Sequence, residues 1–147
     1  MKIGLPKKQK GAAAIEFALV FVIFFAVLYG VLSYSLPLLL VQSFNNSTAE
    51  AVRRSVAVDP TLTAAAYKTA VESVAKGVLD EKLRWVPTAV APSLVKTASY
   101  DPVAGVLTAT VSLPSAALAT LMPVLTLGTV SVPQLPTTLT AQSSMKF

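Results

Sequence analysis

The sequence contains neither cysteine nor histidine, and charged residues make up only 13% of its 147 residues. Without cysteine there is no disulfide and no thiolate nucleophile or metal ligand. Without histidine there is no Ser-His-Asp or Cys-His constellation and no imidazole metal ligand. Soluble domains carry about 25% charged residues. A composition of 54% hydrophobic residues with a mean hydropathy of +0.66 therefore indicates a membrane-attached protein.

Positive charge is concentrated at the amino-terminal end. Residues 1–11 contain Lys2, Lys7, Lys8 and Lys10 and no acid, whereas the eight bases and seven acids of residues 12–147 almost cancel. A nucleic-acid-binding protein carries its basic residues on a folded face, so we expect no nucleic-acid partner. We interpret Lys7, Lys8 and Lys10 as charges that orient a membrane segment.

A long uncharged segment follows. No charged residue occurs between Glu16 and Glu50, and residues 17–41 are predominantly apolar. About 20 helical residues at 1.5 Å each cross a hydrocarbon layer of about 30 Å, so residues 17–36 suffice for a transmembrane span in contact with membrane lipid. Lysine-rich flanks stay in the cytoplasm. This predicts a single-pass protein of a bacterial inner membrane, with a cytoplasmic amino terminus and a periplasmic or external carboxy-terminal domain.

Two other interpretations of the apolar segment are disfavoured. A buried core helix is disfavoured because so short a chain has little with which to cover it. A cleaved secretory signal has an apolar core of about 7–15 residues and a small-x-small cleavage site. This run is longer, and Ser33, Ser35 and Pro37 form only a weak site. Cleavage there would release a secreted binding module that lacks the whole run.

The most specific pattern stands at the start of the apolar segment. A basic stretch over residues 7–10 ends at Gly11, after which Ala12 and three further small or apolar residues lead to Glu16 and Phe17. A carboxylate at the mouth of an apolar helix is costly unless it is paired or hydrated. The presence of Glu16 therefore calls for an explanation.

The residues Gly11, Glu16 and Phe17, within the run 11–20, resemble the processing site of a type IV prepilin. More closely, they resemble the TadE-like pseudopilins of the tight-adherence (Tad or Flp) pilus system. The polar stretch 42–54 resembles the segment that follows this family's anchor, and residues 139–146 are a weaker match. Because major Tad pilins are much shorter, the resemblance implies a minor, TadE-like component that takes part in pilus assembly for surface adherence.

The resemblance also implies partners. A membrane-embedded prepilin peptidase would cut after Gly11 and leave Ala12 as the new amino terminus. Other Tad pilins or pseudopilins and an inner-membrane assembly platform would bind the processed chain, in the membrane or in the pilus. A free α-ammonium on Ala12 would lie about 6 Å along the helix from Glu16, on the same face, and could pair with it in this chain or in a neighbour.

Each of these residues has a simpler explanation too. Gly11 is expected to interrupt the helix, which suits entry into a protease cleft, but it could be an ordinary helix-start glycine. Glu16 could instead lie at the membrane interface beside a helix start, where the helix dipole favours an acid. Pro37 is expected to kink the helix, although membrane helices commonly tolerate proline.

The rest of the chain predicts an α+β protein. We expect a basic leader over residues 1–11, a transmembrane and stalk helix over 12–57, and an external α+β domain over 58–147. In the stalk, a buried stripe is predicted that comprises Val41, Phe44, Thr48, Val52 and Val56. Asp59-Pro60 resembles a helix cap followed by proline at the first helical position, which predicts a second helix over about 61–84. Tyr67 and Trp85 are expected to pack against this core.

Alternation of apolar and polar residues predicts a small antiparallel sheet in the last third of the chain. Residues 94–100 and 107–113 form a predicted hairpin with a loop at 101–105, and residues 139–147 form a third strand. Residues 115–128 are predicted to be a short helix or a covering loop.

No catalytic pattern is present, so an enzyme is not expected. Asp80 and Glu81 are adjacent on the predicted helix and point apart, and Gly105 and Gly128 are solitary, unlike a phosphate-binding loop. We expect no cofactor and no metal. The main alternative to the pseudopilin interpretation is an uncleaved single-pass inner-membrane anchor that scaffolds an envelope or secretion complex.

Overall fold

The computed structural model describes residues 9–127 and 130–147. Two helices precede a set of antiparallel strands and two short 3₁₀ turns, which confirms the predicted α+β class. In chain order the elements are α1 (Gln9–Ser55), α2 (Ala64–Lys82), η1 (Ala91–Ser93), β1 (Val95–Asp101), β2 (Val106–Pro114), η2 (Ser115–Thr120), β3 (Leu125–Leu127), β4 (Val130–Val132) and β5 (Thr138–Lys146).

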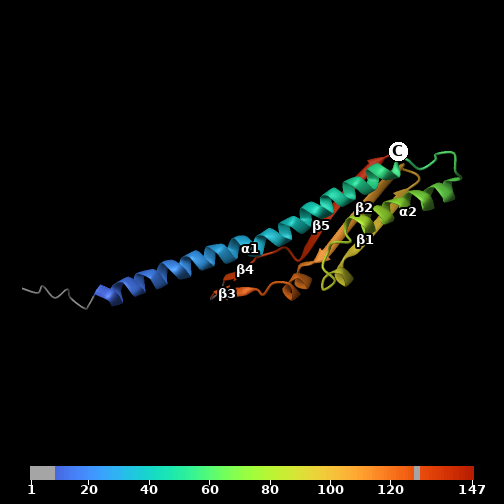
Figure 1. Cartoon of the computed structure of the whole chain (residues 1–147). Helices are drawn as coiled ribbons and strands as arrows, with labels where there is room; N and C mark the ends of the chain where they lie inside the picture. Colours follow the sequence, from blue (N-terminus) through green and yellow to red (C-terminus); the bar gives the residue numbers. More distant parts are fainter. Residues whose placement is uncertain (1–8, 128–129) are drawn as a thin grey trace, which may run out of the picture.

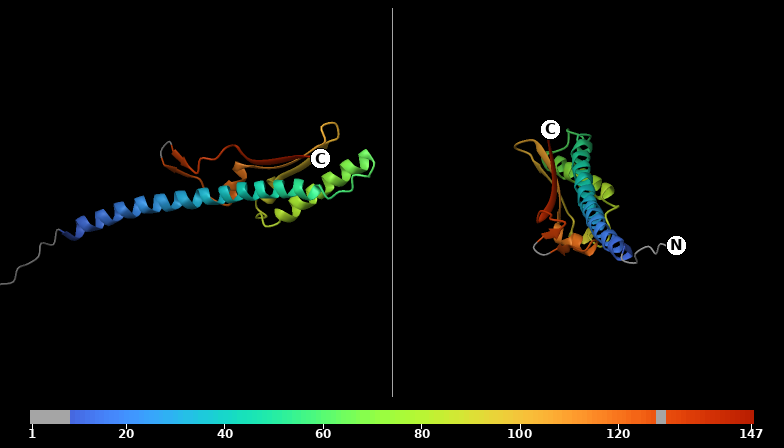
Figure 2. Two further views of the ribbon diagram at one scale, coloured as in Figure 1. Left: turned by 90° about the horizontal axis from the view of Figure 1, so that it is seen from above. Right: turned by 90° about the vertical axis from the view of Figure 1, so that its left-hand side faces the viewer.

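The sheet and the helices form two layers. Strands pair in the order β1-β2-β5, all antiparallel, and one face of this sheet lies against α2 and the carboxy-terminal half of α1 (Figure 1). The other half of α1 extends away from the layers (Figure 2). The chain therefore consists of a small two-layer domain and a helix that belongs to it over only part of its length.

Helix α1 changes character at Ser33. Residues 11–32 include no buried side chain, whereas from Ser33 onward one face is buried against the domain. The buried face comprises Ser33, Pro37, Leu40, Phe44, Ser47, Thr48, Ala51, Val52 and Ser55. The predicted stripe is confirmed at Phe44, Thr48 and Val52, but Val56 is exposed. Residues spaced strictly four apart move gradually around a helix that has 3.6 residues per turn. The last buried residue of the stripe is therefore Ser55 instead of Val56.

Proline and glycine do not interrupt α1. The helix begins at Gln9 and continues through both Gly11 and Pro37. The expected interruption at Gly11 is therefore wrong. Figure 2 shows α1 as one gently curved rod without a sharp bend. Pro37 is buried against the domain, and tertiary packing holds the helix together where its ring removes a backbone donor.

The start of α2 also differs from the prediction. The Thr63 hydroxyl accepts a hydrogen bond from the Ala66 amide, so Thr63 is the N-cap and the helix begins at Ala64. Asp59 instead accepts bonds from the amide (2.9 Å) and hydroxyl (2.8 Å) of Thr61. Asp59-Pro60 thus forms a turn in the connection. An Asp carboxylate can either cap a helix or accept a hydrogen bond from the residue two positions ahead in a turn. Asp59 does the second.

The predicted hairpin is confirmed, with residues 102–105 as its turn. The Asp101 carboxylate accepts bonds from the amides of Val103 and Ala104, and Gly105 has a φ of +66°. A β-carbon on Gly105 would lie 3.1 Å from the Phe147 carbonyl oxygen. Glycine is needed here because the backbone is left-handed and the chain end lies against it.

The segment 115–128 contains both a short turn and a strand. Residues Ser115–Thr120 form η2, and β3 pairs with β4 in an antiparallel ladder that the sequence did not predict. Residue 128 lies outside the described residues. The β3–β4 ladder projects from the sheet back along α1 (Figures 1 and 2).

Tyr67 packs against the core as expected, whereas Trp85 is exposed and does not. The Tyr67 ring meets Tyr100 edge-on, with ring centroids 5.5 Å apart. Trp85 is partly exposed, and its indole N–H donates to the Ser43 hydroxyl at 3.1 Å. Both residues contact neighbouring elements of the domain rather than forming an open aromatic platform.

Phe44→Ala should destabilise the domain strongly. Phe44 is fully buried, and its truncation leaves a cavity that costs about 3–5 kcal/mol. The measurement is denaturant unfolding of the full chain in detergent micelles. The matched control is Asn45→Ala at the adjacent exposed position. Equal unfolding midpoints for the two variants would show that α1 is not part of the core.

Candidate functional site

The candidate site is the amino-terminal part of α1. Gly11, Ala12, Glu16 and Phe17 all lie within the helix and are exposed. Lys7 and Lys8 lie outside the described residues, whereas Lys10 is in the first turn of α1. Ala12 and Glu16 are one turn apart on one face, as predicted from their spacing.

The helix dipole explains Glu16 poorly. Glu16 is seven residues beyond Gln9, where α1 begins, so it lies about 10 Å from the helix start. The stabilisation of an acid by the dipole falls off within the first turn. In the uncut chain, Glu16 is therefore too far from the helix start for the dipole to stabilise it.

An aromatic column follows Glu16 along the helix. Phe17, Phe21 and Phe25 recur every four residues, with ring centroids 6.0 and 5.6 Å apart. All three rings are largely exposed in the single chain. Together with the neighbouring aliphatic residues they make the segment 11–32 apolar on every side, as a helix in lipid or among other helices must be.

This part of the chain can anchor the protein. Among the described residues, α1 is the one helix long and apolar enough to cross a membrane, and its most apolar stretch has no burial within the molecule. This is what a single-pass membrane anchor requires. No His/Cys/Asp/Glu cluster that could hold a metal ion occurs among the described residues.

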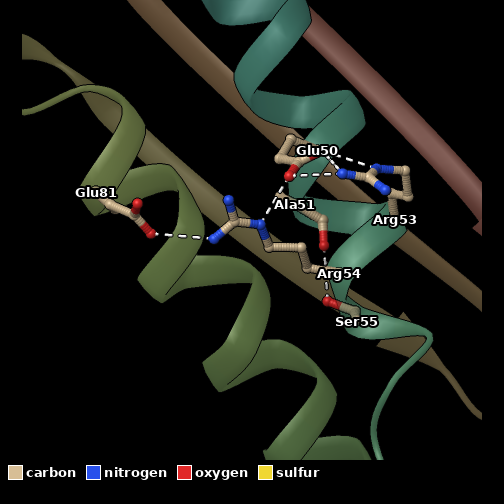
Figure 3. Close-up of polar contacts among 6 residues, drawn as sticks. All are labelled: Glu50, Ala51, Arg53, Arg54, Ser55 and Glu81. Carbon is tan, nitrogen blue, oxygen red and sulfur yellow. Dashed lines mark hydrogen bonds and ion pairs between the residues drawn. The ribbon is translucent and has the colours of Figure 1, made fainter.

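A charge cluster at the other end of α1 ties it to α2. Arg53 donates two bonds to the Glu50 carboxylate (2.8 and 2.9 Å), and the Arg54 Nε donates a third at 2.7 Å. Arg54 also reaches Glu81 of α2 at 3.2 Å (Figure 3). The spacing of Arg53 and Arg54 from Glu50 by three and four residues could have predicted the pairing within α1, but not the contact with Glu81.

Residues 11–53 match the family model described as TadE-like protein. The match begins at Gly11 and confirms the resemblance to TadE-like proteins over this segment. No curated protein and no solved structure matches the chain. The family match and the apolar helix support a Tad pilus-associated membrane protein, and TadE-like pilus components are structural rather than enzymatic.

The matched segment combines two structural regions. It includes the whole exposed part of α1, residues 11–32, and most of the buried stripe that follows. Ala12, Glu16 and Phe17 lie just inside its start, whereas the sheet lies beyond it. The TadE-like part of the chain is therefore almost entirely the long helix.

Hydrogen bonds from Arg54 and Arg53 hold the pKa of the Glu50 carboxyl below its ordinary value. Because the pKa is lowered in the folded state, the cluster stabilises the fold above the unfolded pKa. That contribution is lost as pH falls through the lowered folded value. An NMR titration should give a low midpoint for Glu50 that Arg54→Met raises more than Arg53→Met.

The control for this titration is Lys68→Met, which removes a cation from α2 that is near Glu72 rather than Glu50. It should leave the Glu50 midpoint unchanged. A wild-type midpoint at the ordinary glutamate value would contradict the arrangement in Figure 3.

Proposed function

We propose that the chain is a minor, TadE-like pseudopilin that prepilin peptidase cuts after Gly11 and that takes part in assembling a Tad-type pilus for surface adherence. The proposal rests on the family match over residues 11–53. This match starts at the proposed cleavage site and includes the exposed half of α1. Cleavage would leave Ala12 as the first residue of an apolar helix.

The position of Glu16 supports this role. After cleavage, the α-ammonium of Ala12 and the Glu16 carboxylate are one helical turn apart. A charge pair of this kind in a low-dielectric layer gains Coulomb energy that offsets part of its desolvation cost. In an assembly, Glu16 of one chain would meet the amino terminus of a neighbour, which would fix the stagger between adjacent helices.

The exposed half of α1 supports assembly as well. Residues 11–32 have no buried side chain in the single chain, so lipid can be exchanged for neighbouring helices without unfolding the domain. The Phe17, Phe21 and Phe25 column offers a continuous ridge for such packing. Energy for extraction from the membrane would come from the assembly platform. The remaining alternative is an uncleaved envelope anchor, in which Gly11 and Glu16 have no assigned role.

Cleavage is tested by the amino-terminal residue of the membrane-extracted protein. We expect Ala12 in cells that have the prepilin peptidase and Met1 in cells that lack it. Gly11→Leu should block the cut, because a bulky side chain would then occupy the position before the scissile bond. The matched control is Gly30→Ala, at the other glycine of α1, which has open space around it. An intact Met1 in both strains would favour the uncleaved anchor.

Glu16→Gln is expected to reduce pilus assembly without changing cleavage. The substitution keeps the shape of the side chain and removes its charge, so the pair with the Ala12 amino terminus is lost. Surface piliation and the amount of processed protein are measured together. Glu50→Gln, at the other glutamate of α1, should leave assembly unchanged. Normal piliation with Glu16→Gln would overturn the assigned role.

A further inference from the structure

The β3–β4 ladder is held at a defined level on α1. The Tyr29 hydroxyl donates to the Pro123 carbonyl oxygen, and the Gln134 amide donates to the Tyr34 hydroxyl at 2.8 Å. These two bonds join the residues on either side of the ladder to positions five residues apart on α1. We call residues 122–127 and 130–134 the hairpin segment.

If the hydrocarbon layer starts near Gly11, these bonds lie at its outer edge. At 1.5 Å per residue, Tyr29 lies about 27 Å along the axis from Gly11, and Tyr34 lies about 35 Å from it. A hydrocarbon layer of about 30 Å that starts near Gly11 therefore ends between the two tyrosines. If the hydrocarbon layer starts at Phe17 instead, Tyr29 and Tyr34 both lie inside it. Tyrosines are enriched at the membrane interface.

The hairpin segment has the composition of an interfacial element. No charged residue occurs between Asp101 and Lys146. Val124 and Leu125 are 49% and 41% exposed, although they are apolar. An open hollow of about 390 Å³ lies between η2 and the segment, with Leu118, Met122 and Val124 in its lining. The lining also includes Ser115, Ser131 and Gln134, and the apolar side of the hollow suits part of an acyl chain.

We propose that the hairpin segment inserts into the outer interface of the lipid bilayer beside the point where α1 leaves it. The external domain then rests on the membrane surface instead of standing clear of it. We favour lipid as the partner of this surface because two hydrogen bonds hold the hairpin segment to α1 near the outer edge of the hydrocarbon layer. A two-stranded ladder has unpaired backbone groups at its edges, which are costly in hydrocarbon. This limits insertion to the interface.

The proposal rests on the membrane anchoring of α1 and not on cleavage after Gly11. Because the chain has no cysteine, single substitutions place a probe at one chosen site. Val124→Cys, Val103→Cys and Leu28→Cys would each be labelled with a nitrobenzoxadiazole fluorophore. Each full-length protein would be reconstituted, at no more than one copy per vesicle, into phosphatidylcholine–phosphatidylglycerol vesicles. Quenching is measured with lipids that carry a nitroxide near the headgroup.

Val103 is the matched control, since it is an exposed valine in the β1–β2 turn at the far end of the sheet. Leu28 reports on α1 itself. We expect shallow nitroxides to quench the label at position 124 several-fold more strongly than the label at 103, with a blue-shifted emission. Quenching at 28 but equal, weak quenching at 124 and 103 would overturn the proposal and leave the anchor intact.

Two further outcomes would also overturn it. A blue shift at position 124 that appears only when several copies share a vesicle would make a second copy of the chain the occupant. A label at 28 that shows neither quenching nor a blue-shifted emission would remove the membrane anchor, and with it both this inference and the membrane part of the proposed function. Determination of the amino-terminal residue does not depend on these labels. It therefore distinguishes failure of the membrane-insertion proposal from failure of the proposed cleavage after Gly11.

Discussion

The structure depends on one helix that meets two different surroundings. Residues 11–28 of α1 are exposed on every side, whereas the same helix buries a continuous stripe from Ser33 to Ser55. An isotropic apolar surface suits lipid or neighbouring helices, and a one-sided stripe suits a domain core. Because no loop separates the two regions, the position of the domain relative to the membrane is fixed by a rigid rod.

Small polar side chains allow the domain to approach this rod closely. Thr48 and Ser55 are fully buried. The Thr48 hydroxyl shares a hydrogen bond with Ser143 of β5 (3.0 Å), and the Ser55 hydroxyl bonds the Ala51 carbonyl (2.8 Å) and reaches that of Val71 (3.3 Å). The outer half of α1 is thus a component of the core rather than a stalk beneath it. Any force applied to the helix is transmitted directly to the sheet.

Charged residues gather at the end of α1, whereas the segment between Asp101 and Lys146 has none. A charge cluster at the carboxy-terminal end of α1 comprises Glu50, Arg53 and Arg54 together with Glu81 of α2. The uncharged segment after Asp101 includes the strands that return toward the anchor. Charged groups are costly near hydrocarbon and inexpensive in water, so an uncharged β3–β4 segment suits a position nearer the membrane than this cluster.

Local patterns in the sequence determined the two long helices and the three strands of the main sheet. The uncharged run after Glu16 indicates a long apolar helix, and the alternation over residues 107–113 and 139–147 indicates strands, because both depend on side-chain periodicity alone. The Gly11-to-Phe17 motif indicated the family for the same reason, since its residues are neighbours in the chain. Only the tertiary structure decided that Thr63 rather than Asp59 caps α2, and that Pro37 is absorbed by packing. It alone brought Pro123 and Gln134 to Tyr29 and Tyr34, because contacts between residues about 100 positions apart leave no periodic trace in the sequence.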